Sequence, residues 1–232
     1  MEHKRQIQFY LATTNSNKIK EIEGFLCPIK FFSSFLQISK ANLLIKSLKD
    51  LENYKPVEET GVTFKENAIL KSRHLLKDLK KRGLLPSPLW ILAEDSGLEV
   101  ESLVGAPGIY SARYSGPNAN DRRNNQLLLK NLKNHKNRKA RYVCALSFIL
   151  VREAKTNEEF FEGCCEGKIA HEERGKGGFG YDPLFIPKGE TKTFGELTFQ
   201  FKQEISHRKK ALKKWQKYLE EKKFFPSIEQ KS

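Results

Sequence analysis

The stretch that decides the fold reads Trp90-Ile91-Leu92-Ala93-Glu94-Asp95-Ser96-Gly97-Leu98-Glu99-Val100. The apolar run from Trp90 to Ala93 predicts a buried strand, which carries straight into two adjacent carboxylates and a Ser-Gly break. Consecutive side chains of a strand point to opposite faces, so Glu94 and Asp95 are expected on different sides. Burying a carboxylate at the end of a strand costs free energy unless the carboxylate has a partner. A cation is the expected partner, and Mg²⁺ is the cation expected where all the ligands are oxygen atoms. A magnesium site in a strongly basic chain indicates chemistry on phosphates.

Length and composition predict one sizeable folded domain. The chain has 232 residues, of which 38% are hydrophobic and 11% aromatic, and this is too apolar for a disordered protein. No run of about eighteen apolar residues occurs, and no long apolar segment follows the charged start, so we expect neither a membrane span nor a signal peptide. The four cysteines lack C-x-x-C spacing, which favours reduced thiols and a cytoplasmic location.

The chain carries a large excess of positive charge. Its formal net charge is +14, from 42 Lys and Arg residues against 28 Asp and Glu residues. Such an excess favours anionic partners, namely nucleotides, nucleic acid or acidic lipids. Much of it falls in residues 122–141 and 202–231, and neither block has the aromatic, metal-ligand or heptad pattern of a known nucleic-acid-binding module. We therefore interpret most of these lysines as solvated surface residues and expect no nucleic-acid partner.

Strand and helix patterns together predict an α/β fold with a mixed sheet. Two β-prone runs in succession predict an antiparallel pair, and Thr63-Phe64-Lys65-Glu66 is a capping box that opens a helix. Strands that alternate with helices and also form a hairpin are typical of mixed sheets. Residues 27–55 show no clear period. The predicted strands are 7–12, 90–93, 142–151 and 159–170, and the predicted helices are 18–26, 64–79, 121–132 and 206–223.

Two segments that precede predicted helices are candidate functional loops, and the first of them is a candidate phosphate loop. The first, Thr13-Thr14-Asn15-Ser16-Asn17-Lys18, combines small polar side chains, backbone N–H groups at a helix N-terminus and a lysine. The same residue types are ordinary in turns and caps, so the loop alone leaves both interpretations open. The second, Glu58-Glu59-Thr60-Gly61, precedes a helix that contains Lys71, and the helix dipole alone would explain its carboxylates. Lys71 lies beside the apolar face of that helix, and its spacing alone favours solvent over a cleft.

Two further segments are candidates for recognising a base. Residues 175–183 contain four glycines, the aromatic side chains of Phe179 and Tyr181, and the acceptor Asp182. Glycines permit close approach of a ligand, and the aromatic pair suits stacking on a purine, but a flexible hairpin explains the glycines as well. In Ile205-Ser206-His207-Arg208, Ser206 is a candidate N-cap, so two cations fall in the first turn of a helix. That placement requires a local anion, either a carboxylate or a ligand.

Together, these segments resemble the inosine/xanthosine triphosphate pyrophosphatase family, whose members hydrolyse deaminated purine nucleotides. Five blocks occur in the family's order over most of the chain, and this makes the match specific although no single block would suffice. The blocks are Thr13–Lys18; Glu59–Gly61 with Thr63–Ala68 and Lys71; Ala93–Leu98 running on to Gly105–Tyr114; Gly177–Pro183; and Glu196–Leu197 through Lys202 to Ile205–Arg208.

The resemblance implies a single domain over residues 1–232. Its implied architecture is an elongated mixed β-sheet flanked by helices, with two lobes around a central cleft, usually in a homodimer. The implied activity is Mg²⁺-dependent hydrolysis of ITP, dITP or XTP to the monophosphate and pyrophosphate, which removes these nucleotides from the pool. Stretches near 27–55 and 80–90 look inserted relative to the family core. The expected partners are a nucleoside triphosphate and a second copy of the chain.

Each matching position carries an implied role. By resemblance, Asp95 is expected to be the catalytic carboxylate and to form the metal site with Glu59, while Ser96 is expected to contact the substrate beside the metal. The expected triphosphate contacts are Thr13, Thr14, Asn15, Ser16, Asn17, Lys18, Lys71 and Lys202. The expected base-recognition group is Phe179, Gly180, Tyr181, Asp182, His207 and Arg208.

Two positions depart from the family pattern, and two alternative functions stay open. Thr14 stands where the family commonly has Gly, and Glu94 stands where it commonly has a second Asp. One alternative is a pyrophosphatase for pyrimidine or other modified nucleotides, which base preference would separate from the leading hypothesis. The other is a non-enzymatic basic binder of nucleotides or nucleic acid. It predicts steeply salt-dependent binding and leaves Glu59 and Asp95 unexplained.

Overall fold

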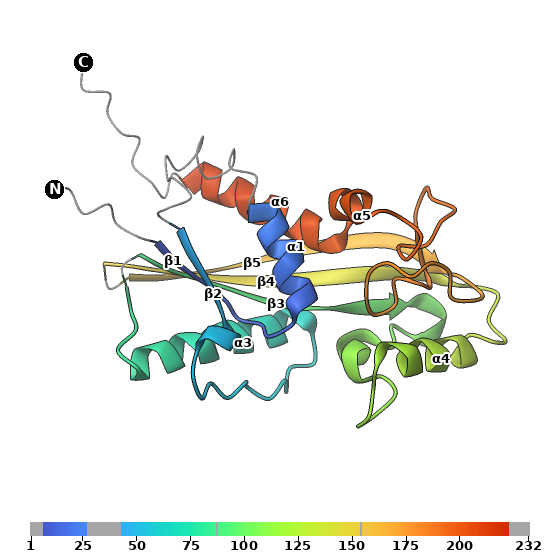
Figure 1. Cartoon of the computed structure of the whole chain (residues 1–232), viewed down its shortest axis with the longest axis horizontal. Helices are drawn as coiled ribbons and strands as arrows, with labels where there is room; N and C mark the ends of the chain where they lie inside the picture. Colours follow the sequence, from blue (N-terminus) through green and yellow to red (C-terminus); the bar gives the residue numbers. More distant parts are fainter. Residues whose placement is uncertain (1–6, 27–42, 87, 154, 223–232) are drawn as a thin grey trace, which may run out of the picture.

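A six-stranded mixed sheet forms the centre of the computed structural model, which describes residues 7–26, 43–86, 88–153 and 155–222 (Figure 1). The strand order is β2-β1-β3-β4-β5-β6. Strand β1 pairs in parallel with β2 and β3, whereas β3, β4, β5 and β6 pair antiparallel in succession. The strands are β1 (Ile7–Leu11), β2 (Leu43–Ser47), β3 (Leu89–Val100), β4 (Lys139–Arg152), β5 (Lys155–Ile169) and β6 (Phe185–Pro187). The predicted α/β class with a mixed sheet is confirmed.

Helices cover both faces of the sheet. In Figure 1, α1, α5 and α6 lie on one side, and α3 and α4 lie on the other. The helices are α1 (Ser16–Leu26), α3 (Phe64–Lys81), α4 (Asp121–Asn131), α5 (Phe199–Ile205) and α6 (His207–Lys222). Three short 3₁₀ helices connect them to the strands: η2 (Leu48–Asp50), η3 (Glu101–Leu103) and η4 (Gly108–Arg113).

Both faces of β1 and β3 are buried, which explains the unbroken apolar run before Glu94. On one face, Phe9 and Trp90 pack against Trp215 of α6, with ring centroids 5.9 and 6.1 Å from the Trp215 ring. On the opposite face, Tyr10 and Ile91 belong to a cluster built with the leucines of α3. A strand covered by helices on both faces needs apolar side chains at every position.

A separate apolar cluster holds the far end of the sheet. It joins the last residues of β3 to α4, to the start of β4 and to the segment between β5 and α5, and its members include Leu98, Leu128, Tyr142, Tyr181 and Phe185. The sheet is long, and the two ends carry different helices (Figure 1). The expected elongated arrangement of two lobes follows from these separate cores.

Most of the predicted elements are confirmed, and several extend further. Helix α3 begins as predicted, because the Thr63 hydroxyl accepts a hydrogen bond from the Glu66 N–H at 3.1 Å. The antiparallel pair is present as β4 and β5. Strand β2 lies in residues 27–55, the stretch without a clear period. Residues 27–42 of that stretch fall outside the described part of the chain, and so does Lys223, the predicted end of the last helix. The interpretation of residues 27–55 and 80–90 as insertions relative to the family core stays a prediction.

The expected break after Asp95 is wrong. Strand β3 continues through Ser96 and Gly97 to Val100, paired with β4 along its whole length. Glycine is needed here for a different reason: a Cβ at position 97 would lie 2.3 Å from Ser111 Oγ and 2.6 Å from the Gly108 carbonyl oxygen. The missing side chain therefore lets η4 pack directly on the strand, beside the acidic pair.

We expect Gly97→Ala to destabilise the protein by about 1–3 kcal/mol, because the added methyl group overpacks a contact with fixed backbone. The matched control is Gly24→Ala in α1, where an added Cβ meets nothing within 4 Å. That substitution should stabilise the helix by about 0.5–1 kcal/mol. Urea unfolding of both variants measures the difference, and a Gly97→Ala protein as stable as the wild type would contradict the packing argument.

Val104 is strained. It follows η3 with φ 53° and ψ 40°, in the left-handed region, and its side chain is 97% exposed. A β-branched residue is unfavourable in this region, and exposure leaves it no compensating contact. We expect Val104→Asn to raise stability by about 1 kcal/mol, because asparagine tolerates this conformation.

The corresponding rise in melting temperature is about 2–4 °C for a chain of this size. Val62→Asn is the control, since Val62 is 79% exposed but lies outside the left-handed region. It should change stability by less than about 0.5 kcal/mol. Equal melting shifts in the two variants would show that loss of an exposed apolar side chain, and not relief of strain, is responsible.

Candidate active site

A cavity of about 410 Å³ lies between the two lobes and gathers most of the predicted site residues. Its lining comes from the β1–α1 loop, the segment before α3, α3 itself, the centre of β3, η4, α4, the glycine-rich loop, α5 and the start of α6. The predicted residues that line it are Thr13, Thr14, Asn15, Lys18, Glu59, Lys71, Asp95, Ser96, Phe179, Gly180, Tyr181, Asp182, Lys202, His207 and Arg208. Ser16 and Asn17 do not line it, and Ser16 Oγ instead accepts from Lys49 Nζ at 2.6 Å.

The β1–α1 loop is organised by Asn15. Its side-chain oxygen accepts from the backbone N–H groups of Asn17 and Lys18 at 3.0 and 3.2 Å, so it caps α1. Thr13 Oγ1 accepts from the Asn15 N–H at 3.1 Å. The turn-and-cap interpretation is therefore correct for Asn15, and the loop also contributes Thr13, Thr14 and Lys18 to the cavity.

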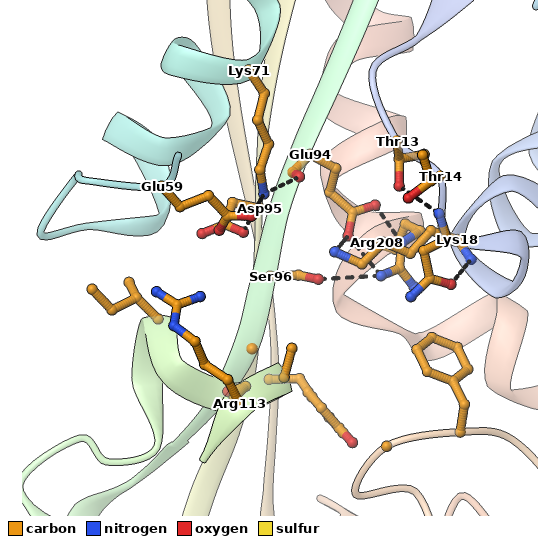
Figure 2. Close-up of a pocket in the computed structure, with 18 of the residues that line it drawn as sticks. Thr13, Thr14, Lys18, Glu59, Lys71, Glu94, Asp95, Ser96, Arg113 and Arg208 are labelled. Atoms are coloured by element: carbon orange, nitrogen blue, oxygen red, sulfur yellow. Dashed lines mark hydrogen bonds and ion pairs between the residues drawn. The ribbon is translucent and has the colours of Figure 1, made fainter. Parts of the chain in front are cut away.

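Asp95 faces α3 and is held by two of its residues (Figure 2). Lys71 Nζ lies 2.7 Å from Asp95 Oδ1 and 3.1 Å from Glu59 Oε1, and it also donates to the Glu94 carbonyl oxygen. The Asn67 side chain donates to Asp95 Oδ2 at 3.3 Å. The spacing argument that pointed Lys71 at solvent is wrong, because the buried carboxylate of Asp95 draws the ammonium group into the cleft.

Burial sets the protonation of this cluster. Burial raises the pKa of Asp95 above its ordinary value, although the Lys71 ammonium opposes the shift. Burial also works against the charged form of Lys71, but the Asp95 and Glu59 carboxylates outweigh it and raise the pKa of that lysine. A carboxylate with a raised pKa, fixed beside a permanent cation, is suited to accept a proton from water.

Glu94 faces the opposite side of β3 and meets the start of α6. Arg208 donates to both of its carboxylate oxygens, from Nε at 2.5 Å and from Nη2 at 2.7 Å, and Lys18 Nζ lies 3.2 Å away. Burial alone would raise the pKa of Glu94, but Arg208 and Lys18 hold it well below its usual value. The predicted alternation of the two acids is confirmed, and the anion required beside Arg208 is a carboxylate. Ser206 caps α6, accepting from the Lys209 N–H at 3.1 Å.

Glu21 is a site residue that the sequence analysis missed. It lies on the inner face of α1 and is 3% exposed. Its carboxylate accepts a hydrogen bond from Arg208 Nη1 and lies 3.0 Å from Lys202 Nζ. An acid on the apolar face of a helix, one turn after Lys18 and one turn before Phe25, was the available signal.

Lys202 lines the cavity beside the glycine-rich loop, and its place among the triphosphate contacts stays a prediction. Its Nζ atom is 2.6 Å from Asp182 Oδ2 and sits 4.5 Å from the centre of the Phe179 ring. Asp182 also accepts from the Phe179 N–H at 2.8 Å. The lysine and the aspartate therefore fix the conformation of the loop around Phe179.

The expected aromatic pair is separated by the fold. Tyr181 is 3% exposed, and its hydroxyl donates to the Ser111 carbonyl oxygen at 2.8 Å, so its ring packs in the far-end core. His207 stacks on Tyr142 with ring centroids 4.8 Å apart, and its Nδ1 atom has no hydrogen-bond partner within the described residues. Burial and the neighbouring Arg208 hold the pKa of His207 well below its usual value, so the ring is neutral at neutral pH.

The described residues contain no cluster of three or more His, Cys, Asp or Glu side chains arranged to hold a metal. Glu59 and Asp95 do converge on one cation, the Lys71 ammonium. Both are hard oxygen donors, and Mg²⁺ commonly uses one or two carboxylates while keeping several waters. Cys144, Cys164 and Cys165 are free thiols, and no helix among the described residues has the length and apolar character to cross a membrane.

A mixed sheet flanked by helices, with paired acids and cations lining a central cavity, defines an α/β protein with a polar central site. The chain belongs to the Ham1 family, whose model matches residues 9–218. It is 40% identical over 204 residues to a dITP/XTP pyrophosphatase of Clostridium tetani, covering 88% of this chain and 92% of the relative. It is 41% identical over 213 residues to the dITP/XTP pyrophosphatase of Bacillus subtilis, covering 90% and 96%.

Solved structures agree with this assignment. The Ham1 protein of Staphylococcus aureus superposes with a TM-score of 0.75 at 36% identity, covering 93% of this chain and 99% of that one. A HAM1 protein from Coxiella burnetii also gives a TM-score of 0.75, at 34% identity, over 93% of this chain and all of the other. The predicted family and fold are confirmed.

Proposed function

We propose that this protein is a Mg²⁺-dependent pyrophosphatase that hydrolyses ITP, dITP and XTP to the nucleoside monophosphate and pyrophosphate. The observation that carries the proposal is the buried Asp95 carboxylate, held by Lys71 and Asn67 in a cavity that also contains an accessible aromatic side chain, Phe179. The curated relatives support the substrate class, because they are named dITP/XTP pyrophosphatases.

In the proposed reaction, Asp95 acts as the general base. It accepts a proton from the water that attacks the α-phosphate, and pyrophosphate leaves. Phosphoryl transfer needs positioning and charge neutralisation more than covalent help, which fits a site without an activated nucleophile. Lys71 holds the carboxylate in place and, with Lys18 and the Thr13–Thr14 loop, lines the space proposed for the phosphates.

Glu59 and Asp95 are the residues that would hold the metal. Both carboxylates already pair with one cation, the Lys71 ammonium, and this supports a shared role in binding positive charge. A bound Mg²⁺ supplies charge neutralisation for phosphate oxygens and lowers the pKa of a bound water. Ser96 follows Asp95 along β3 and is proposed to contact the substrate beside this site.

Base selection is proposed to rest on the glycine-rich loop and the start of α6. Phe179 would stack on the purine, while Lys202 and Asp182 hold its loop. A 6-oxo purine accepts a hydrogen bond where adenine donates one, so donors at this end favour hypoxanthine and xanthine. His207 has a free ring nitrogen, and Arg208 is fixed by two acids that keep its guanidinium in place. Gly180 and Tyr181 also line the cavity and are proposed to complete the group that contacts the base.

Identifying the products tests the proposal. We expect ITP with Mg²⁺ to yield IMP and pyrophosphate, with neither IDP nor orthophosphate, and we expect chelation by EDTA to stop the reaction. Release of orthophosphate from ITP would indicate a different phosphatase chemistry. A preference for pyrimidine triphosphates would instead support the alternative pyrophosphatase. By resemblance, we also propose a homodimer in the cytoplasm, which sedimentation and cell fractionation would test.

A further inference from the structure

The cations that line the cavity differ in one respect. Four of them are paired with acids in the protein itself: Lys18 with Glu94, Lys71 with Asp95 and Glu59, Lys202 with Asp182 and Glu21, and Arg208 with Glu94 and Glu21. Arg113 also lines the cavity, but among the described residues no carboxylate lies within ion-pair distance of its guanidinium. Its charge is therefore available to a ligand.

Arg113 is placed to reach the proposed phosphate space. It is the last residue of η4, which is fixed on β3 by the close packing at Gly97. Its side chain rests against the Tyr110 ring, with the guanidinium carbon 5.1 Å from the ring centre. Figure 2 shows it extending from η4 toward the side of the cavity where Glu59 and Asp95 lie.

Arg113 itself, which has no paired acid among the described residues, favours an anionic ligand at this position, whereas the cavity as a whole is not positively charged, since its lining also includes Asp121. The paired cations are already offset by five acids, which are Glu21, Glu59, Glu94, Asp95 and Asp182. A nucleoside triphosphate adds several negative charges, and most of them sit on the two phosphates that leave as pyrophosphate. An unpaired arginine presents a planar fork that matches two phosphate oxygens at once.

We infer that Arg113 is a pyrophosphate-binding residue, which clamps the leaving pyrophosphate from the η4 side of the cavity. This inference rests on the proposed function. It assigns the arginine a task that the paired lysines fulfil less well, since each of them must first give up a carboxylate. The stacking on Tyr110 holds the side chain ready without neutralising its charge.

Binding of inorganic pyrophosphate and of IMP, both with Mg²⁺, tests the inference by calorimetry. We expect Arg113→Gln to weaken pyrophosphate binding about tenfold or more, as expected for loss of charge-assisted hydrogen bonds, and to leave IMP binding unchanged. Arg113→Lys should recover part of the loss, because it restores the charge without the fork. Arg122→Gln is the matched control, since this exposed arginine of α4 lies outside the cavity lining.

Unchanged pyrophosphate binding in Arg113→Gln would overturn the inference, as would an equal loss for pyrophosphate and IMP. The outcome is separable from failure of the proposed function. If the wild type binds pyrophosphate through Arg113 but does not hydrolyse ITP, the proposed reaction fails and the binding role stands. If it hydrolyses ITP and Arg113→Gln leaves both pyrophosphate binding and the KM for ITP unchanged, only the arginine's role fails.

Discussion

Asp95→Asn is expected to lower the rate of pyrophosphate release from ITP by about a hundredfold or more, the range of a lost general base. The substitution keeps the size of the side chain and its hydrogen bonding to Asn67, but it removes the charge that Lys71 holds at 2.7 Å. Steady-state kinetics with a coupled pyrophosphate assay measures the loss. The melting temperature, recorded in parallel, shows whether the variant is folded.

Asp78→Asn is the control for this experiment. Asp78 lies on the same helix as Lys71 and pairs with Arg82 at the protein surface, far along α3 from the cavity. We expect its activity to match the wild type, because an exposed pair of this kind contributes little. An Asp95→Asn protein that is folded and keeps more than about a tenth of the wild-type rate would contradict the assignment of the general base.

Glu21→Ala is expected to lower the free energy of unfolding by about 3–5 kcal/mol, the range for removing one member of a buried ion-pair network. Its carboxylate is shared by Arg208 and Lys202, both of which are buried and would lose a counter-charge. Urea unfolding gives the value directly. Glu21→Gln keeps one acceptor oxygen and should lose less.

Glu23→Ala on the same helix serves as the control, since Glu23 is only partly buried and lines no cavity. It should change the free energy of unfolding by less than about 0.5 kcal/mol. A Glu21→Ala protein as stable as the Glu23→Ala protein would show that the network adds nothing to the fold. Loss of ITP hydrolysis in a folded Glu21→Gln protein would add that Glu21 also positions Arg208.

The parts of the fold that the sequence predicted share a physical basis. Helices α3 and α6 and strand β4 each bury a regular apolar face, and that regularity is visible in the residue order. Strand β2 has five residues and no alternation, so nothing marked it. The continuation of β3 past Asp95 depends on its pairing with β4, a contact between distant residues that local patterns do not contain.

For the site, the sequence predicted which residues lie together better than it predicted which partners their side chains contact. Resemblance placed most of its residues in one cavity, and the structure brings them together. The direction of Lys71 and the place of Lys202 depend on where the opposite carboxylates lie, and sequence spacing holds no such information. Glu21 escaped notice because an acid beside apolar neighbours looks like an ordinary surface residue until its two cationic partners are known.

Asp95 and Glu94 differ in their partners and in the direction in which their pKa values are shifted. Asp95 faces α3 and the proposed metal partner Glu59, with a pKa that burial raises. Glu94 faces α6 and is neutralised by Arg208 and Lys18, with a pKa far below its usual value. The longer side chain at position 94 reaches Arg208, so Glu94 holds the start of α6, where the proposed base-recognition group lies.

The proposed selectivity for 6-oxo purine nucleotides is best tested by kinetics. The quantity to measure is the ratio of kcat/KM for ITP to that for ATP, followed as pyrophosphate release with Mg²⁺. We expect a preference for ITP of about a hundredfold or more, because donors near Phe179 donate to the 6-oxo oxygen of hypoxanthine and leave the amino group of adenine unpaired. Equal turnover of ITP and ATP would contradict the account.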